Sequence, residues 1–487
     1  MTTSATPLTG GSRIQPAAFW ISIALTYGLS SLALSALLGS MSAAVIMLGV
    51  VALAGGFYTV WRWPTAGVGI VLAIMPLHFL AVELGQFYGV PQITALSGAT
   101  KEIPLLLLTF VLWRRNGIKF GAPDYFILAC FTLAALRTAF GGTVAGLRDD
   151  FAFLIPYFLG RVTVLAGRQE RLWARRAVWV AAALSIAGVA ETLVIGPLPR
   201  ELLYAAVNVN RVATSPDRLL PSSFYASNFE GIRAASTMVG PPSFAALCMI
   251  ALIIWWVYLR NPLPAALMAA GLICALTRSA WIGTGLAILV LAPKLGQKRR
   301  LAGYALLVVA LFAVAIPILD IHDYVSTSRS GQEASEQFHR ENVAGGLTHI
   351  IAHPLGSGAG NVGPAAGEQN ANVVVTENTY LGFAAEYGMP VALCFLGFLL
   401  SALRHAWQRE DQLGYLAVGI LIGFSAVMSV LLIHEDLRLA CWVWFPVGLS
   451  LRRVPVVRPS VGILPAEGPM ALSRRACSAQ ATSVEIG

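Results

Sequence analysis

The segment TENTYLGFAAEYG, residues 376–388, contains three polar side chains suited to acid–base chemistry or sugar binding. Glu377 and Asn378 precede an apolar run, and Glu386 lies inside it. A carboxylate at a membrane surface is partly desolvated, which raises its pKa and suits it to accept the proton of a sugar hydroxyl. Glu377 can instead stabilise the start of a helix through the helix dipole, and Asn378 can bind sugar or cap the helix. Glu386 can line a chamber, join a buried ion pair or stay protonated.

Two arginines each stand at the start of an apolar run, Arg233 in GIRAAS and Arg278 in LTRSAWIG. Guanidiniums bind a diphosphate through charge-assisted, bidentate hydrogen bonds and stabilise the negative charge of a leaving group. An arginine near a helix end is also typical of an anchor in lipid headgroups, and Arg278 can simply be the polar tip of a hairpin. An outer arginine opposes the usual charge bias of membrane proteins, which favours a function for Arg278.

The loop expected over residues 320–377 adds two candidates, His339 and Arg340. His339 is a second candidate for the base, and Arg340 is a candidate for sugar binding or support. A histidine in a wet loop needs no such role. The spacing of His339, His349 and His353, ten and then four residues, does not fit a metal site. We predict no metal and no other cofactor.

The same loop contains an amphipathic pattern and a glycine-rich stretch. Apolar residues recur at helical spacing between Val343 and Ile351, so residues 333–352 are predicted to form a helix on the bilayer surface that Pro354 ends. The stretch GSGAGNVG at 356–363 lacks the flanking βαβ pattern of a nucleotide-binding loop. It is predicted to allow close approach of the backbone to a ligand or to a neighbouring helix.

These residues belong to a chain that is too hydrophobic for a soluble domain. Of 487 residues, 57% are hydrophobic and 12% are charged, and the mean hydropathy is +0.71. We predict an all-α polytopic membrane protein of about 12–14 transmembrane helices, because about 14 apolar runs approach the length that crosses a bilayer. The short runs at 101–113 and 151–166 are tilted spans, re-entrant pieces or halves of broken helices. The expected spans are 17–38, 41–60, 66–87, 101–113, 123–140, 151–166, 176–195, 238–259, 262–277, 279–294, 301–319, 378–402, 413–433 and 437–451.

Basic residues gather in every second connection between these spans, which the positive-inside rule assigns to the cytoplasm. Much of the net charge of +9 is therefore an orientation signal and not a footprint for nucleic acid. Both termini are then cytoplasmic, and two long loops lie on the outer face. The cysteines fall in expected spans or in the tail, so no disulfide framework is predicted.

The expected organisation follows from this topology. It comprises a cytoplasmic N-terminus (1–16), an N-terminal transmembrane bundle (17–195), an outer loop (196–237), central transmembrane helices (238–319), a large outer loop (320–377), C-terminal transmembrane helices (378–453) and a disordered cytoplasmic tail (454–487). Charged residues inside expected spans also lie near outer ends. They predict a polar chamber in the outer half of the bundle, and they are Glu83, Lys101, Glu102, Arg137 and Glu191.

Four stretches occur in a characteristic order around the hydrophobic spans: GIRAASTMVGPPSFAALC, LTRSAWIG, HPLGSGAGNVG and TENTYLGFAAEYGMPVALCFLG. Together they resemble the bacterial O-antigen ligase and O-antigen or exopolysaccharide polymerase superfamily over residues 225–450. The N-terminal half resembles the family only in being a row of spans.

The resemblance implies a metal-independent, GT-C-like glycosyltransferase of the bacterial inner membrane. It would transfer a glycan from an undecaprenyl-diphosphate-linked donor to a sugar hydroxyl on the periplasmic face. The resemblance assigns diphosphate binding to Arg233 and Arg278, and acceptor activation to Glu377. Ligases of this family typically carry His-Asn where this chain has Glu377-Asn378, which favours a polymerase whose acceptor is another lipid-linked repeat unit over a ligase that transfers to lipid A core. This departure from the family pattern also leaves open that His339 is the base, in which case Glu377 would orient His339 or a sugar.

A transporter or flippase for a lipid-linked saccharide is the alternative from another class. Transporters place coupling charges near the midplane and show paired broken helices in two repeats. Here the charges gather at the outer side and no internal repeat is evident. The expected partners are a lipid-linked oligosaccharide donor, a saccharide acceptor, membrane lipids and a polysaccharide chain-length regulator, with no nucleic acid.

Overall fold

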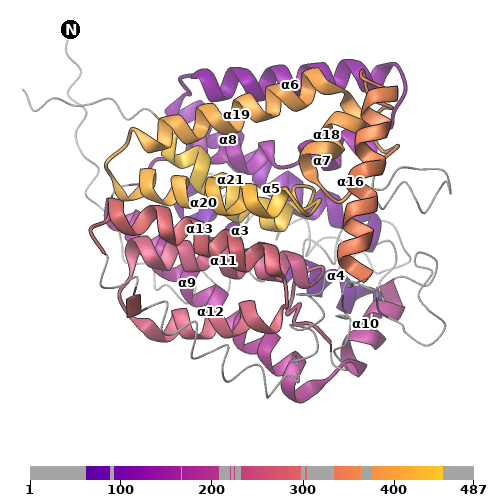
Figure 1. Cartoon of the computed structure of the whole chain (residues 1–487). Helices are drawn as coiled ribbons and strands as arrows, with labels where there is room; N and C mark the ends of the chain where they lie inside the picture. Colours follow the sequence, from indigo (N-terminus) through magenta and orange to yellow (C-terminus); the bar gives the residue numbers. More distant parts are fainter. Residues whose placement is uncertain are drawn as a thin grey trace, which may run out of the picture. The chain divides into compact units, whose positions relative to one another are not determined.

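The computed structural model describes residues 62–87, 93–165, 167–207, 220, 224, 232–297, 302–303, 334–362 and 376–452. Within these ranges the secondary structure elements are helices (Figure 1). The expected N-terminus (1–16), the expected spans 17–38 and 41–60, nearly all of 301–319, and the tail at 454–487 lie outside the described residues.

The described helices follow one another along the chain with short connections in most places. In order they are α3 (Pro64–Ile74), η1 (Met75–Leu77), α4 (His78–Phe87), α5 (Ile93–Asn116), α6 (Ala122–Ala139), α7 (Val144–Phe151), α8 (Leu154–Val162), α9 (Gly167–Ala190), η2 (Glu191–Ile195), α10 (Leu198–Val207), α11 (Pro241–Tyr258), α12 (Pro262–Cys274), α13 (Arg278–Lys294), α16 (Ala334–Ala352), α18 (Thr379–Tyr387), α19 (Met389–Trp407), α20 (Gln412–Met428) and α21 (Leu437–Ser450).

Four of the described helical segments are long and apolar enough to cross a membrane: Thr65–Leu84, Gly167–Ile195, Pro241–Tyr258 and Met389–Trp407. The helices α12, α20 and α21 are apolar as well but shorter. An all-helical chain with several such segments supports a polytopic membrane protein. The number of spans predicted from the sequence also counts residues outside the described ranges, and it stays a prediction.

Two expected spans are not single long helices. The run at 151–166 forms only the nine-residue α8, which begins at Leu154 after α7 ends at Phe151, and this length fits the expected re-entrant piece or half of a broken helix. The run at 378–402 is not one helix either, since it divides at Gly388 into α18 and α19. Gly388 has a φ of 91°, a left-handed conformation that ends α18, and Pro390 then opens the next helix. Glu386 therefore lies in the last turn of a short helix and not deep in a long one.

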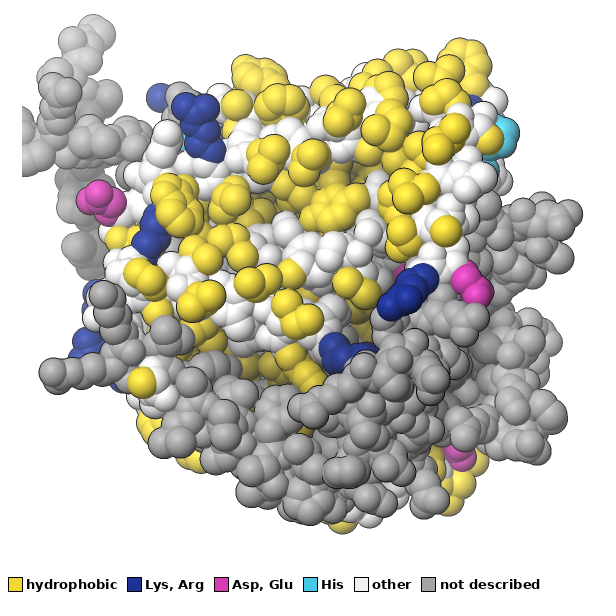
Figure 2. All heavy atoms as spheres, in the orientation of Figure 1, with side chains coloured by type: hydrophobic (Ala, Val, Ile, Leu, Met, Phe, Trp, Pro, Cys, Tyr) yellow, Lys and Arg dark blue, Asp and Glu magenta, His cyan; other side chains and the backbone are white. Residues whose placement is uncertain are grey.

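The outward face of α6 and α19 is strongly hydrophobic (Figure 2). On α6, Tyr125 is 65% exposed and Leu136 is 55% exposed; on α19, Leu393 is 60% exposed and Leu400 is 58% exposed. Such a continuous apolar surface is costly in water and is typical of helices that face lipid. The opposite faces of both helices pack on each other, with Phe126 of α6 against Gly397 of α19.

Close helix contacts in the core depend on glycine. A Cβ added at Gly160 of α8 would lie 2.2 Å from the carbonyl oxygen of Phe445, and one added at Gly448 of α21 would lie 2.1 Å from that of Tyr157. The two backbones can therefore approach only because both positions lack a side chain. Small residues at helix interfaces are a general device of membrane proteins, where packing replaces the hydrophobic effect.

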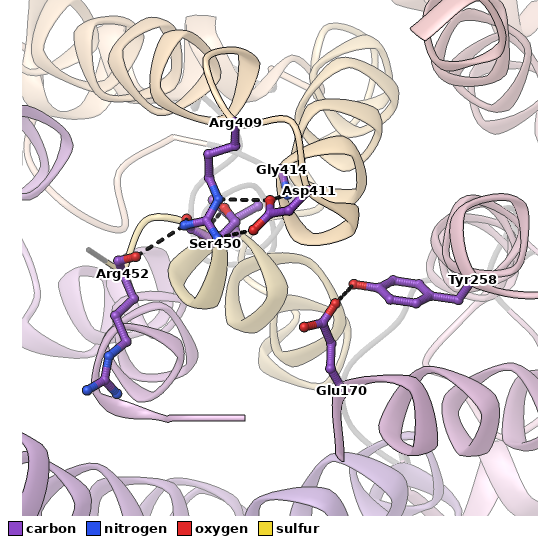
Figure 3. Close-up of polar contacts among 8 residues, drawn as sticks. Glu170, Tyr258, Arg409, Asp411, Gly414, Ser450 and Arg452 are labelled. Atoms are coloured by element: carbon purple, nitrogen blue, oxygen red, sulfur yellow. Dashed lines mark hydrogen bonds and ion pairs between the residues drawn. The ribbon is translucent and has the colours of Figure 1, made fainter. Parts of the chain in front are cut away.

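One end of the bundle, where α11, α19 and α21 finish and α9 and α20 begin, is tied together by polar contacts (Figure 3). The Arg409 guanidinium donates to the carbonyl oxygens of Ser450 (2.7 Å) and Arg452 (3.2 Å), and it pairs with Asp411. Tyr258 donates its hydroxyl proton to Glu170. Lys294 also belongs to this end, since its Nζ donates to the carbonyl oxygen of Trp407 at 3.1 Å. Asn378 contacts Ser429, which follows the other end of α20.

Candidate active site

A cavity of about 470 Å³ lies between α16, the start of α18 and the segment that follows α20. We call it the site cavity. It brings together three of the predicted residues, Arg340, Glu377 and Asn378. Its other lining residues are Asn342, Val343, Ala344, Leu347, Thr376, Leu381, Ser429 and Val430. The α16 side of the cavity is therefore mixed, with Arg340 and Asn342 beside Val343, Ala344 and Leu347, and the start of α18 adds mainly polar residues.

Asn378 explains how this segment is held. It is the N-cap of α18, and its Oδ1 accepts hydrogen bonds from the amides of Tyr380 (2.9 Å) and Leu381 (3.1 Å). Its Nδ2 donates to the carbonyl oxygen of Ser429 at 2.6 Å, which ties α18 to the end of α20. The predicted capping role is confirmed. Because the cap is fixed on two sides, the preceding Glu377 is held at the cavity wall, where it is partly exposed.

The helix predicted at 333–352 is present as α16, which ends at Ala352, immediately before His353 and Pro354. Figure 1 shows it crossing beside α18. Val343, Leu347 and Ile351 form an exposed apolar stripe, whereas Ile350 is 8% exposed and packs toward α18. The backbone of His339 belongs to α16, but its side chain lies outside the described ones. Its role as a base stays a prediction.

His349 and His353 are four residues apart in the sequence, and their ring centroids are 4.7 Å apart. Burial, and then the neighbouring His353, lower the pKa of His349. Neither histidine lines the site cavity.

Arg233 and Arg278 meet at one turn. The Arg233 guanidinium donates to the carbonyl oxygens of Ala275 (3.0 Å) and Leu276 (3.2 Å) and to Oγ1 of Thr277 (2.8 Å). Arg278 follows directly as the first residue of α13. Leu276 has a φ of 46°, so this turn is strained, and the three bonds from Arg233 help to hold it.

Replacing Arg233 by Lys should therefore lower stability as well as activity. A lysine keeps the charge but cannot reproduce three donor bonds in fixed directions. We expect a loss of roughly 1–2 kcal/mol in the free energy of unfolding, measured as a lower thermal midpoint in detergent. An unchanged midpoint would mean that the turn does not depend on this guanidinium.

The register of α13 against α20 places Arg278 near the site cavity. The two helices are antiparallel, since a Cβ added at Gly283 would lie 2.6 Å from the carbonyl oxygen of Gly423, and one added at Gly419 would lie 2.7 Å from Leu291. The start of α13 is then level with the end of α20, just before Ser429 and Val430 of the cavity wall. The predicted arginines and the predicted acid thus share one end of the bundle.

Among the described residues Glu386 has no cationic partner, which one of its sequence-based alternatives supposed. Its Oε1 accepts from the amides of Gly360 (3.2 Å) and Val362 (3.4 Å), and its carboxyl is hydrogen bonded to Asp150. Two carboxyl groups can share a hydrogen bond only when one of them holds a proton. Glu386 therefore fits the alternative of a protonated, supporting acid that anchors the glycine-rich loop.

A second cavity, much smaller, lies beside Glu386 and contains residues that the sequence patterns did not single out. Asp150 accepts a hydrogen bond of 2.5 Å from the Tyr387 hydroxyl, and its other oxygen lies 3.4 Å from Nε2 of His434. Glu435 follows His434, and burial raises the pKa of its carboxyl to about 7. The sequence does contain a signal for this cluster, the polar triplet HED at 434–436, which separates two apolar runs.

Atoms of Asp150, His434 and Glu435 that could bind a metal ion lie within 4.8 Å of one another. Both oxygens of Asp150 already have partners inside the cluster, the Tyr387 hydroxyl and the His434 ring. We therefore assign the cluster to hydrogen bonding and proton exchange and propose no metal chemistry for it.

The other charges predicted to form a polar chamber are mostly paired. Arg200 lies 3.2 Å from Glu83 and 3.4 Å from Glu191, and all three side chains are largely buried. Glu191 also accepts from the amides of Ala235 (3.0 Å) and Ser236 (2.6 Å). These contacts hold the segment that carries Arg233, so this part of the expected chamber acts as a support.

The glycine-rich stretch is a brace between helices, which confirms the predicted close approach of backbones. The amide of Gly358 donates to the carbonyl oxygen of Glu386 (2.7 Å), and the amide of Met389 donates to that of Pro354 (3.1 Å). Arg137 of α6 donates to the carbonyl oxygens of Leu355 and Gly356. The stretch thus connects the end of α16 to α6 and to the junction of α18 and α19.

Gly358→Ala should unfold the protein more easily. Gly358 has a φ of 102°, and an added Cβ would lie 1.4 Å from the carbonyl oxygen of Gly141. We expect a cost of about 2–4 kcal/mol, from backbone strain and displacement of the brace, measured by thermal unfolding in detergent. Gly345→Ala on α16 is the matched control, since nothing lies within 4 Å of its added Cβ; equal midpoints for the two variants would contradict the brace.

Comparison with known proteins bears on the segment that carries most of these residues. A search of curated proteins found no match. Residues 263–396, from α12 to the first part of α19, match the family model described as O-antigen ligase. This segment includes Arg278, Arg340, Glu377 and Glu386, whereas Arg233 precedes it. The resemblance that the sequence motifs predicted is thereby confirmed for residues 263–396, which are similar to the O-antigen ligase family.

Proposed function

We propose that this protein is an inner-membrane glycosyltransferase that acts on undecaprenyl-diphosphate-linked glycans at the periplasmic face and polymerises repeat units of a surface polysaccharide. The observation that supports the proposal is the site cavity, whose lining includes Glu377, Asn378 and Arg340. The start of α13, with Arg278, adds support because it is level with the end of α20, next to this lining. The match to the O-antigen ligase family supports a reaction of this general type.

In the proposed reaction the acceptor sugar lies in the site cavity, with its hydroxyl at Glu377. The hydroxyl loses its proton to this carboxylate as its oxygen bonds to the anomeric carbon of the donor sugar. The bond from that carbon to the diphosphate breaks, and its electron pair stays on the diphosphate. Arg278, with Arg233 behind it, stabilises the added negative charge through hydrogen bonds from guanidinium groups.

The apolar wall of the cavity suits an acceptor that arrives from the bilayer. Val343 and Leu347 line the cavity and are also exposed on the surface of α16, with 40% and 48% of their surface accessible. A lipid-linked repeat unit could keep its lipid along this stripe while its sugar reaches Glu377. The stripe suits either lipid-linked acceptor, and the acid at position 377 favours a polymerase.

A ligase that transfers the glycan to lipid A core is the second candidate, because the matching family model is described as O-antigen ligase. One experiment separates the two. Purified protein receives a synthetic polyprenyl-diphosphate oligosaccharide with and without lipid A core. Ladders of increasing length in both reactions support a polymerase, and a product on the core alone supports a ligase. Uptake into vesicles without any covalent product would overturn the enzyme and favour a transporter.

A further inference from the structure

Thr376 lies between the two cavities and lines both. Its side chain is 1% exposed. A Cβ added at Gly346 of α16 would lie 2.9 Å from its methyl group, whereas one added at Gly382 would lie 3.5 Å from its hydroxyl oxygen. Gly382 lines the second cavity, so the hydroxyl is directed toward that side. In the described part of the chain this hydroxyl has no hydrogen-bond partner.

A buried hydroxyl without a partner is unfavourable by roughly 1–3 kcal/mol, and most proteins avoid it. Valine has the same shape and would carry no such cost. The neighbouring Thr379, which is equally buried, satisfies its hydroxyl by donating to the carbonyl oxygen of Leu431 at 2.8 Å. Packing alone therefore does not explain a threonine at position 376, and we look for a function of its hydroxyl.

The groups beyond Thr376 can exchange a proton. The second cavity is lined by Asp150, Glu386, His434 and Glu435, and Tyr387 donates into the cluster. Asp149 of α7 is the remaining charged neighbour that acts on Glu435. Ligand atoms of Asp150, His434 and Glu435 lie within 4.8 Å of one another, and Glu386 is hydrogen bonded to Asp150. The cluster therefore contains neighbouring carboxyl groups that can receive or release a proton. On the other side of Thr376, its chain neighbour Glu377 faces the site cavity.

We propose that this cluster takes up the proton that Glu377 removes from the acceptor, and that the Thr376 hydroxyl relays it. The inference rests on the proposed function. Each transfer releases one proton, because the acceptor O–H bond breaks while the diphosphate gains the electron pair. The hydroxyl makes no hydrogen bond at rest, so it must turn to accept this proton from the Glu377 carboxyl and to give its own proton to a carboxylate of the cluster. Glu377 is then ionised again, and the reverse transfer returns the proton to water after the products leave.

The test compares Thr376→Val with Thr376→Ser. Valine keeps the branched shape and removes the hydroxyl, so we expect kcat to fall about tenfold with KM unchanged. Serine keeps the hydroxyl and should restore most of the rate. Thr379→Val is the matched control, because it removes a buried hydroxyl from the same segment, and Thr379 lines neither cavity. This variant should keep the wild-type dependence of kcat on pH.

The pH profile distinguishes a relay from a structural role. Glu435 accepts a proton only when ionised, so kcat of the wild type should decline as pH falls below about 7. Thr376→Val and Glu435→Gln should both lose this decline, and Glu435→Gln decides the matter if the valine variant does not fold. A wild-type rate and profile in Thr376→Val, or equal losses in the valine and serine variants, would overturn the relay. Inactivity of the wild type would instead count against the proposed function.

Discussion

Replacing Glu377 by Gln should lower kcat by about 100- to 10,000-fold, the usual contribution of a positioned general base. Glutamine has nearly the same shape and can still bind a sugar hydroxyl, but its amide cannot take up a proton at neutral pH. Because Glu377 is partly exposed at the cavity wall and the cap of α18 is supplied by Asn378, the variant should fold normally. KM for the acceptor should change little.

The measurement is the initial rate of glycan transfer with a synthetic lipid-linked donor. Glu410→Gln is the matched control, since it removes an exposed acid at the opposite end of the bundle, between α19 and α20. Its rate should equal that of the wild type. If Glu377→Gln keeps more than a tenth of the activity, the base lies elsewhere, and His339→Gln should then show the large loss instead.

Local patterns in the sequence predicted the local parts of this site. The end of α16 before Pro354, the capping by Asn378 and the close approach at the glycine-rich stretch each depend on residues a few positions apart. Over that range the residue types themselves determine the steric and hydrogen-bonding preferences of the backbone. They can therefore be recognised without knowledge of the fold.

The pairings between distant residues could not be predicted in the same way. Tyr387 and Asp150 are 237 positions apart, and nothing near either residue indicates the other. The same holds for Arg161 and Asp124, a buried pair at 2.7 Å that joins α8 to α6. The sequence shows each of these charges as a group that is unfavourable to bury within an apolar run. Which residue pairs with it depends on which helices pack together. For Glu386 the sequence left an ion pair and a protonated acid open, and the contacts with Asp150 and two backbone amides fit the protonated acid.

The division of α18 from α19 is an intermediate case. Gly388 and Pro390 are both signals that end or restart a helix, yet the continuous hydrophobicity from 378 to 402 predicted one span. The carbonyl oxygen of Pro354 accepts from the amide of Met389, so the break is stabilised by a loop from another part of the chain. This contact places Glu386 beside the loop amides, and hydrophobicity alone contains no information about it.

Arg278→Lys should lose most of the activity, about 100-fold or more in kcat, although the charge is retained. The proposed leaving group is a diphosphate, and a guanidinium can donate two parallel hydrogen bonds to its oxygens, whereas an ammonium acts as a single point charge. The geometry favours this use, because Arg233 fixes the preceding residues 275–277 and so fixes where α13 begins. Lysine at 278 keeps that turn intact, so the thermal midpoint should not change.

Arg260→Lys is the matched control, since it alters an exposed arginine that follows α11 at the opposite end of the bundle. It should leave both kcat and the thermal midpoint unchanged. The contrast with Arg233→Lys is equally informative, because that variant should lose stability together with activity. Near wild-type turnover in Arg278→Lys would remove Arg278 from the diphosphate site. A loss confined to KM would instead mean that the guanidinium binds the donor equally in the ground state and the transition state.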